Sequence, residues 1–150
     1  MKFNLILLLL TTLTAVVLSQ NIPGQTIIQL FEHDFYWGLN GTEVVLHPGG
    51  IEAIRWTIVP YAEGNFINYN DKSVQYNGDF KPLTIENGTE SLDQRWIIEP
   101  NNVPGIPSLI CSSQVSGVCA TAVDKDGEWV VIAAPRSFIN PLQRWILYSL

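Results

Sequence analysis

One short phrase occurs three times along the chain, and it constrains the fold more than any other feature. An arginine is followed by a tryptophan, then by one residue and then by isoleucine or leucine, and the three tryptophans are Trp56, Trp96 and Trp145. They are 40 and 49 residues apart, a spacing typical of a repeated supersecondary unit. In a strand, the tryptophan and the residue two positions later lie on one face. We therefore expect the phrase to form the last strand of each of three similar units.

The remainder of each unit has the pattern of short strands. Runs rich in Ile, Val, Trp and Tyr alternate with clusters of Gly, Pro, Asn and Asp, and we find no convincing amphipathic helix. Four runs occur in each of three repeats, at about residues 25–59, 64–99 and 108–150. The pattern predicts an all-β chain, a β-trefoil of three four-stranded repeats, in which six strands close a barrel and three hairpins cap it. A β-sandwich with chance repetition of Arg-Trp is the alternative.

Residues 1–19 have the three-part pattern of a secretory signal peptide: Lys2, an apolar run that ends near Leu18, and the small residue Ser19. A transmembrane anchor is the alternative, but the run is interrupted by threonines and is shorter than the roughly 20 apolar residues that a span needs. No other stretch could span a membrane. The pattern therefore predicts a secreted, extracellular protein whose mature part is one domain of residues 20–150.

The charge pattern restricts the partners. The formal net charge of −6 becomes about −7 when Lys2 is removed, and the basic residues are scattered along the chain. Without a basic patch, nucleic acid and anionic membranes are not expected to bind.

Cys111 and Cys119 are the only cysteines, and an oxidising compartment favours a disulfide between them. The Ser116-Gly117 turn places such a bridge across a hairpin, and two buried free thiols are the alternative. Two thiols without a nearby histidine do not make a zinc site. Asp124 and Asp126 lack the other ligands of a calcium loop, so no metal is expected.

Two N-glycosylation sequons begin at Asn40 and Asn87. They fit a secreted glycoprotein and indicate surface loops. Asn40-Gly41 is also expected to be the two-residue turn of a hairpin in the first repeat.

Gln94-Arg95-Trp96 and Gln143-Arg144-Trp145 match the Gln-x-Trp motif of the ricin B-type lectins, and Ser116-Gly117-Val118-Cys119 is similar to that family's Gly-x-Cys-Leu-Asp stretch. The resemblance covers about residues 25–150 and implies a sugar-binding β-trefoil. It also implies that Trp56, Trp96, Trp145 and Gln143 are structural core residues. In the family, sugars are contacted by an aspartate after the Cys-Leu position, an aromatic residue at the end of the third strand, and an Asn-type residue beside the glutamine. This chemistry suits hydroxyl groups and an apolar sugar face.

The three repeats depart from that pattern to different degrees. In the third, the matching residues are Thr121, Ala134 and Leu142, which predicts an inactive subsite. In the first, the matching positions hold Gly38 and His47, and Ile54 replaces the glutamine. The second repeat keeps the most polar groups, and its predicted carbohydrate-binding residues are Asn77, Glu86, Asp93 and Gln94.

These residues favour a secreted, lectin-like carbohydrate-binding module with degenerate sugar subsites and a glycan or glycoprotein as partner. The alternative is a β-trefoil protease inhibitor that acts on an extracellular protease through an exposed loop, because Gly64-Asn65-Phe66-Ile67 also resembles fungal trefoil inhibitors. Its candidate loops are Pro100–Pro107 and Ala134–Pro141, the second with Arg136.

Catalysis is not expected. The two histidines, His33 and His47, both lie in the first repeat and are not accompanied by a nucleophile and an acid in a recognisable set. We therefore expect a non-enzymatic protein without a cofactor.

Overall fold

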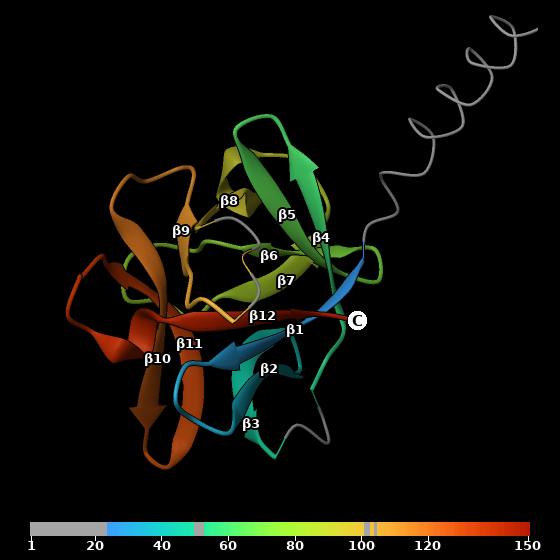
Figure 1. The fold of residues 1–150 in the computed structure, drawn as a ribbon. Helices are drawn as coiled ribbons and strands as arrows, with labels where there is room; N and C mark the ends of the chain where they lie inside the picture. The colour runs from blue at the N-terminus through green and yellow to red at the C-terminus, as the bar shows by residue number, and fades with distance from the viewer. Residues whose placement is uncertain (1–23, 50–52, 101–102, 104) are drawn as a thin grey trace, which may run out of the picture.

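The computed structural model describes residues 24–49, 53–100, 103 and 105–150, which form a β-rich body (Figure 1). The predicted signal peptide, residues 1–19, lies outside these residues. Unit one consists of β1 (Gln25–Leu30), β2 (Phe35–Asn40), β3 (Glu43–Pro48) and β4 (Trp56–Tyr61). Unit two consists of β5 (Gly64–Tyr69), β6 (Lys72–Gln75), β7 (Thr84–Asn87), the 3₁₀ helix η1 (Leu92–Gln94) and β8 (Trp96–Glu99). Unit three consists of β9 (Leu109–Ser112), β10 (Val118–Lys125), β11 (Glu128–Pro135), the 3₁₀ helix η2 (Pro141–Gln143) and β12 (Trp145–Ser149).

The first and last strands of the units form a closed barrel. Strand β1 pairs with β12 and β4, and the pairing continues from β4 through β5 and β8 to β9. Ser108, next to β9, and Trp145 of β12 exchange two backbone hydrogen bonds of 2.7 and 2.9 Å, which complete the circle. Each barrel strand therefore has a neighbour on both sides, and the barrel has no free edge.

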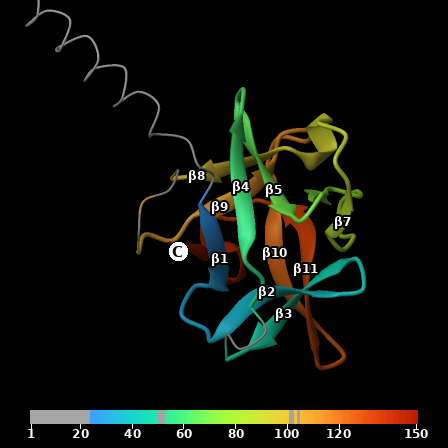
Figure 2. The same cartoon turned by 90° about the vertical axis from the view of Figure 1, so that its right-hand side faces the viewer.

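The middle strands of each unit form a hairpin, and the three hairpins meet one another. Val45 of β3 pairs with Val130 of β11, and Glu43 of β3 pairs with Thr84 of β7. Pro82 and Ile132 complete the triangle. Figure 2 shows that the turns of the β4–β5 and β10–β11 hairpins lie at opposite ends of the molecule. This arrangement confirms the predicted β-trefoil of three four-stranded repeats.

The motif tryptophans begin β4, β8 and β12, and each is fully buried. In the described part of the chain, no ring contact joins two of these three indoles directly. Trp37 of β2 instead lies between Trp56 and Trp145, and contacts both edge-on at centroid distances of 5.8 and 5.4 Å. Trp37 is not part of the motif, yet it is fully buried and connects two of the motif indoles.

Two local predictions are wrong by one or two residues. Asn40 pairs with Glu43, so the turn of the β2–β3 hairpin consists of Gly41 and Thr42 rather than Asn40 and Gly41. Gly41 has φ = 62°, as the first central residue of a type II′ turn requires. In unit two, the sequence Val74-Gln75-Tyr76-Asn77 predicts a strand over residues 74–77, but β6 ends at Gln75.

The 3₁₀ helices η1 and η2 were not predicted, because three residues are too few to produce a helical period. No helix in the described part of the chain is long and apolar enough to cross a membrane.

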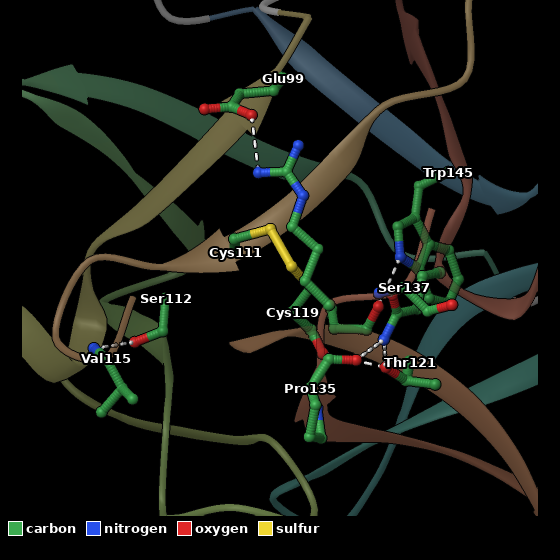
Figure 3. The surroundings of a disulfide bond; sticks show 12 residues. Glu99, Cys111, Ser112, Val115, Cys119, Thr121, Pro135, Ser137 and Trp145 are labelled. Carbon is green, nitrogen blue, oxygen red and sulfur yellow. Dashed lines mark hydrogen bonds and ion pairs between the residues drawn. A yellow bond between two sulfur atoms is a disulfide. The ribbon is translucent and has the colours of Figure 1, made fainter. Parts of the chain in front are cut away.

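The predicted disulfide between Cys111 of β9 and Cys119 of β10 is confirmed (Figure 3). The two cysteines face each other in an antiparallel pair, as expected for a bridge across a hairpin. The bridge therefore ties a barrel strand to the hairpin of unit three.

Candidate functional site

The motif glutamine of unit three connects the hairpin to the chain that follows it. Gln143 is 1% exposed, and its Nε2 donates to Thr121 Oγ1 at 2.9 Å and to the Pro135 carbonyl at 2.7 Å. Its Oε1 accepts from the Ser137 amide at 2.8 Å. In Figure 3, Ser137 and Thr121 lie close to Trp145, and Pro135 lies farther from it. Gln143 therefore has the structural role that was predicted, and we call this arrangement the glutamine clamp.

Unit two contains the same clamp. Gln94 is fully buried, and its Nε2 donates to Gln75 Oε1 at 3.0 Å and to the Asn87 carbonyl at 2.9 Å. Its Oε1 accepts from the Thr89 amide at 2.8 Å. The Gln94 side chain, predicted to bind carbohydrate, thus supports the surface from below and offers no exposed atom to a ligand.

Unit one has no clamp. In units two and three, the motif indole donates to a backbone carbonyl of the second strand, from Trp96 to Val74 at 2.9 Å and from Trp145 to Ala120 at 3.0 Å. In unit one, Ile54 stands in place of the glutamine, and Trp56 Nε1 is buried without a hydrogen-bond partner among the described residues.

The clamps correct the predicted register of the sugar subsite in unit two. Thr121, at the aspartate position of unit three, accepts from Gln143, and the residue that accepts from Gln94 is Gln75. Gln75, rather than Asn77, therefore occupies the aspartate position. The prediction was wrong because it extended β6 by two residues. The alternation of Ser73, Val74 and Gln75 around an inward-facing valine is the pattern that could have located Gln75.

Asn77 instead closes the β6–β7 connection. Its Oδ1 accepts from Gln75 Nε2 at 3.1 Å, and its Nδ2 donates to the Pro82 carbonyl at 3.0 Å and to Thr84 Oγ1 at 2.9 Å. Both the oxygen and the nitrogen of the Asn77 side-chain amide are therefore hydrogen-bonded within the protein, and Asn77 holds the β6–β7 connection in place.

Two half-buried carboxylates lie at the ends of this hydrogen-bond network. Glu86 Oε1 accepts from Thr84 Oγ1 at 3.1 Å, and Asp93 Oδ1 accepts from Ser91 Oγ. Ser91 in turn contacts Thr89, which donates to Gln94 at 3.2 Å. Glu86 Oε2 and Asp93 Oδ2 have no partner within the described ranges. All four predicted residues therefore belong to one network, and we call its outer surface, formed by Glu86 and Asp93, the unit-two face.

Tyr76 borders this network from the β6–β7 connection. Its amide donates to the Asp93 carbonyl at 2.8 Å, and its hydroxyl donates to Asp79 Oδ1 at 2.6 Å. The hydrogen bond to Asp79 raises the pKa of the Tyr76 phenol above its usual value, with a smaller contribution from burial. Tyr76 therefore stays a neutral hydroxyl at physiological pH.

The three matching positions of unit three, Thr121, Ala134 and Leu142, offer no polar side-chain atom without a partner. Thr121 is 4% exposed, accepts from Gln143 and donates to the Cys119 carbonyl at 3.0 Å. Ala134 and Leu142 complete the surface with apolar side chains. Whether unit three binds a sugar stays a prediction.

In unit one, a histidine fills the corresponding space. The His47 ring lies directly over Gly38, so that a Cβ atom at Gly38 would overlap His47 Cδ2. An aspartate at Gly38 could not be accommodated with His47 in this position.

The sequon residues Asn40 and Asn87 are both exposed, and Asn40 Nδ2 donates to Glu128 Oε1 at 2.9 Å. Their glycosylation stays a prediction.

No group of three potential metal ligands occurs among the residues that the structure describes. Asp124 Oδ1 accepts from the Gly127 amide at 2.8 Å and so shapes a turn.

Three hollows occur elsewhere on the surface. One of about 270 Å³ lies beside β4 and β5, one of about 240 Å³ lies between the β4–β5 turn and β8, and one of about 380 Å³ lies between β3 and the β10–β11 hairpin. None of these three is lined by Asn77, Glu86 or Asp93, so the unit-two face lies outside them.

No family model matches the chain, and no curated protein matches its sequence. Solved structures, however, share its fold. ThreeFoil, a designed three-fold symmetric protein, has a TM-score of 0.68 and 14% identity, and the match covers 85% of this chain and 99% of that one. A Polyporus squamosus lectin, whose structure holds the epitope Neu5Acα2-6Galβ1-4GlcNAc, has a TM-score of 0.68 and 18% identity over 87% of this chain and 50% of the lectin.

The same fold also occurs inside larger proteins. Cry35Ab1 matches with a TM-score of 0.67 and 18% identity, over 87% of this chain but only 36% of its own length. The chain thus spans about a third of Cry35Ab1 and half of the Polyporus lectin. These similarities are similarities of fold, and they agree with the β-trefoil described above.

Proposed function

We propose that the chain is a secreted, non-catalytic module that binds saccharides, and that the unit-two face is a binding surface. One observation carries the proposal. At the aspartate position, the His47 ring covers Gly38 in unit one, and Thr121 and Gln75 are hydrogen-bonded internally in units three and two. Unit two differs at the other two matching positions, where Glu86 Oε2 and Asp93 Oδ2 have no protein partner in the described chain.

The chemistry of the unit-two face suits hydroxyl groups. A carboxylate accepts two or more hydrogen bonds, and charge-assisted hydrogen bonds of this kind are stronger than neutral ones. Thr84 and Ser91 hold the carboxylates from one side, which reduces the side-chain entropy lost on binding. The lectin among the structural neighbours supports this class of ligand, and the Cys111–Cys119 disulfide supports an oxidising compartment.

A glycan array tests the proposal with three forms of the chain: the wild type, Glu86→Ala with Asp93→Ala, and a control with Asp34→Ala and Glu63→Ala. We expect the first double variant to lose a set of glycans that the wild type binds, and the control, which removes two exposed carboxylates elsewhere, to keep them. The absence of any bound glycan at high protein density, or an unchanged set in the first double variant, would refute the proposal.

One observation favours the protease inhibitor as a second candidate, because the β11–η2 loop is held in a fixed shape. Gln143 binds the Ser137 amide, and Arg144 Nη2 donates to the Phe138 carbonyl at 3.0 Å. Phe138 and Ile139 at its tip are 76% and 92% exposed. A loop held in one shape binds a protease cleft with a smaller entropic cost.

Arg136, the residue favoured for this role from sequence, is not the tip. It pairs with Glu99 at 3.3 Å and lies over the Phe138 ring at 4.9 Å. Titration of trypsin-, chymotrypsin- and papain-type proteases with Arg136→Ala and Phe138→Ala tests this candidate. Inhibition should depend on Phe138 more than on Arg136, and unchanged activity of all three enzymes at micromolar protein would exclude the inhibitor. The other candidate loop, Pro100–Pro107, lies partly outside the described residues.

A further inference from the structure

The hollow between β3 and the β10–β11 hairpin differs from the unit-two face in position and in lining. Phe35 and Trp129 supply aromatic side chains, residues 45–48 of β3 supply a third side, and Gly127 and Glu128 form part of its rim. Its volume of about 380 Å³ lies within the range of small-molecule sites, roughly 300–1,000 Å³, whereas the other two hollows are smaller. The lining comes from units one and three, which lack a free polar group at the lectin-like positions described above.

Trp129 gives this hollow an aromatic platform. All five tryptophans lie in the described part of the chain, and the other four are fully buried, whereas Trp129 is partly exposed. Its ring packs against Phe35 at a centroid distance of 5.4 Å, which fixes its orientation. A fixed indole presents a large apolar surface without further loss of side-chain freedom.

Glu128 supplies a positioned hydrogen-bond acceptor beside that platform. Asn40 Nδ2 donates to Glu128 Oε1 at 2.9 Å, and Glu128 Oε2 has no partner in the described ranges. His47 also lines the hollow. Residues 124–128 include three carboxylates and one lysine, and this negative charge disfavours an anionic ligand.

We propose that this hollow is a second binding site and that it takes one neutral saccharide ring. The apolar C–H face of the ring lies on Trp129, and its hydroxyl groups donate to Glu128. This second site rests on the proposed function only in its choice of a saccharide as ligand. Its location is independent, because the hollow and the unit-two face share no side chain.

Tryptophan fluorescence provides a direct test, because Trp129 is the tryptophan that a soluble quencher can reach. The probes are the methyl glycosides of galactose, glucose and N-acetylglucosamine at millimolar concentration, with sialyllactose as the anionic comparison. We expect at least one neutral glycoside to protect Trp129 from acrylamide, and sialyllactose to give no protection. Glu128→Ala should weaken the protecting glycoside about tenfold through loss of a charge-assisted hydrogen bond. Glu63→Ala, which removes an exposed carboxylate outside the hollow, should leave the affinity for that glycoside unchanged.

The outcomes separate this site from the proposed function. If no neutral glycoside protects Trp129, or if protection is equal in Glu128→Ala and wild type, the second site is wrong, even when the array shows binding that depends on Glu86 and Asp93. If protection persists in the Glu86→Ala and Asp93→Ala variant, as we expect, the hollow binds independently of the unit-two face. Loss of protection in that variant would overturn the assignment to the hollow.

Discussion

Units two and three contain the glutamine clamp, and unit one completes the same fold without it. Gln94 and Gln143 each join the hairpin to the loop before the last strand, and each neighbouring indole has a backbone acceptor. In unit one, Ile54 replaces the glutamine, and Trp37 packs edge-on against Trp56. All three units therefore bury the motif tryptophan, and in unit one Trp56 has an aromatic contact with Trp37 where the other two units have the clamp.

Units two and three then differ in what the clamp leaves exposed. In unit three, the Thr121 hydroxyl is hydrogen-bonded to Gln143, and the other two matching positions hold the apolar residues Ala134 and Leu142. In unit two, the clamp holds Gln75, and a chain of hydrogen bonds leads outward to Glu86. One structural device is therefore shared, while the capacity to bind a polar ligand depends on the residues around it.

The largest expected effect is on the feature that all units share. Trp96→Ala should lower the free energy of unfolding by about 3–5 kcal/mol, because it opens a large cavity in the barrel. It also removes the donor to the Val74 carbonyl. Urea unfolding followed by circular dichroism measures the loss, and a value below about 1 kcal/mol would contradict the core role of the motif.

The next largest loss of stability is expected when the glutamine clamp of unit two is removed. Gln94→Leu keeps the volume but leaves the Thr89 amide and the Asn87 carbonyl without their partner, which should cost about 2–3 kcal/mol. The reciprocal change Ile54→Gln in unit one should not stabilise the protein, because no clamp partner is prepared there. Urea midpoints compare the two variants, and a gain in Ile54→Gln would show that unit one retains a latent clamp.

A smaller effect is expected at Gly38 of unit one, which the His47 ring covers. Gly38→Ala should cost about 1–3 kcal/mol through overpacking against the His47 ring. The double variant with His47→Ala should recover part of this loss, because the ring is then absent. Thermal unfolding measures both, and equal losses in the single and double variants would mean that His47 is not the obstacle.

The smallest effect concerns the exposed loop of unit three. Arg136→Ala breaks the ion pair with Glu99. The side chains of Arg136 and Glu99 are 33% and 51% exposed, so solvent screening limits the loss in free energy of unfolding to about 0.5 kcal/mol. Gln143→Leu, which removes the clamp on the same loop, is the comparison and should cost several times more. Equal losses in thermal unfolding would show that the ion pair holds the loop.

The sequence predicted the features that depend on repetition and alternation. The Arg-Trp phrase located the last strand of each unit, and its tryptophans are buried as expected. The disulfide followed from the turn between the two cysteines. These features are set by short-range spacing or by a strict period, which a single sequence displays directly.

Features that depend on side-chain contacts between distant strands were missed. Gln75 was overlooked because the end of β6 is fixed by its pairing with β7 rather than by a local stop residue. The role of Trp37 between two motif tryptophans and the overlap of His47 with Gly38 depend on packing in three dimensions. The hollow at Trp129 joins units one and three, so no single repeat contains it.

A nuclear magnetic resonance titration of the ¹⁵N-labelled chain tests the central claim most directly, with a glycan whose array binding depends on Glu86 and Asp93. The account predicts amide shifts that cluster in residues 84–94, with little change around Gly38 in unit one or Thr121 in unit three. Shifts confined to those two regions, with residues 84–94 unmoved, would contradict it.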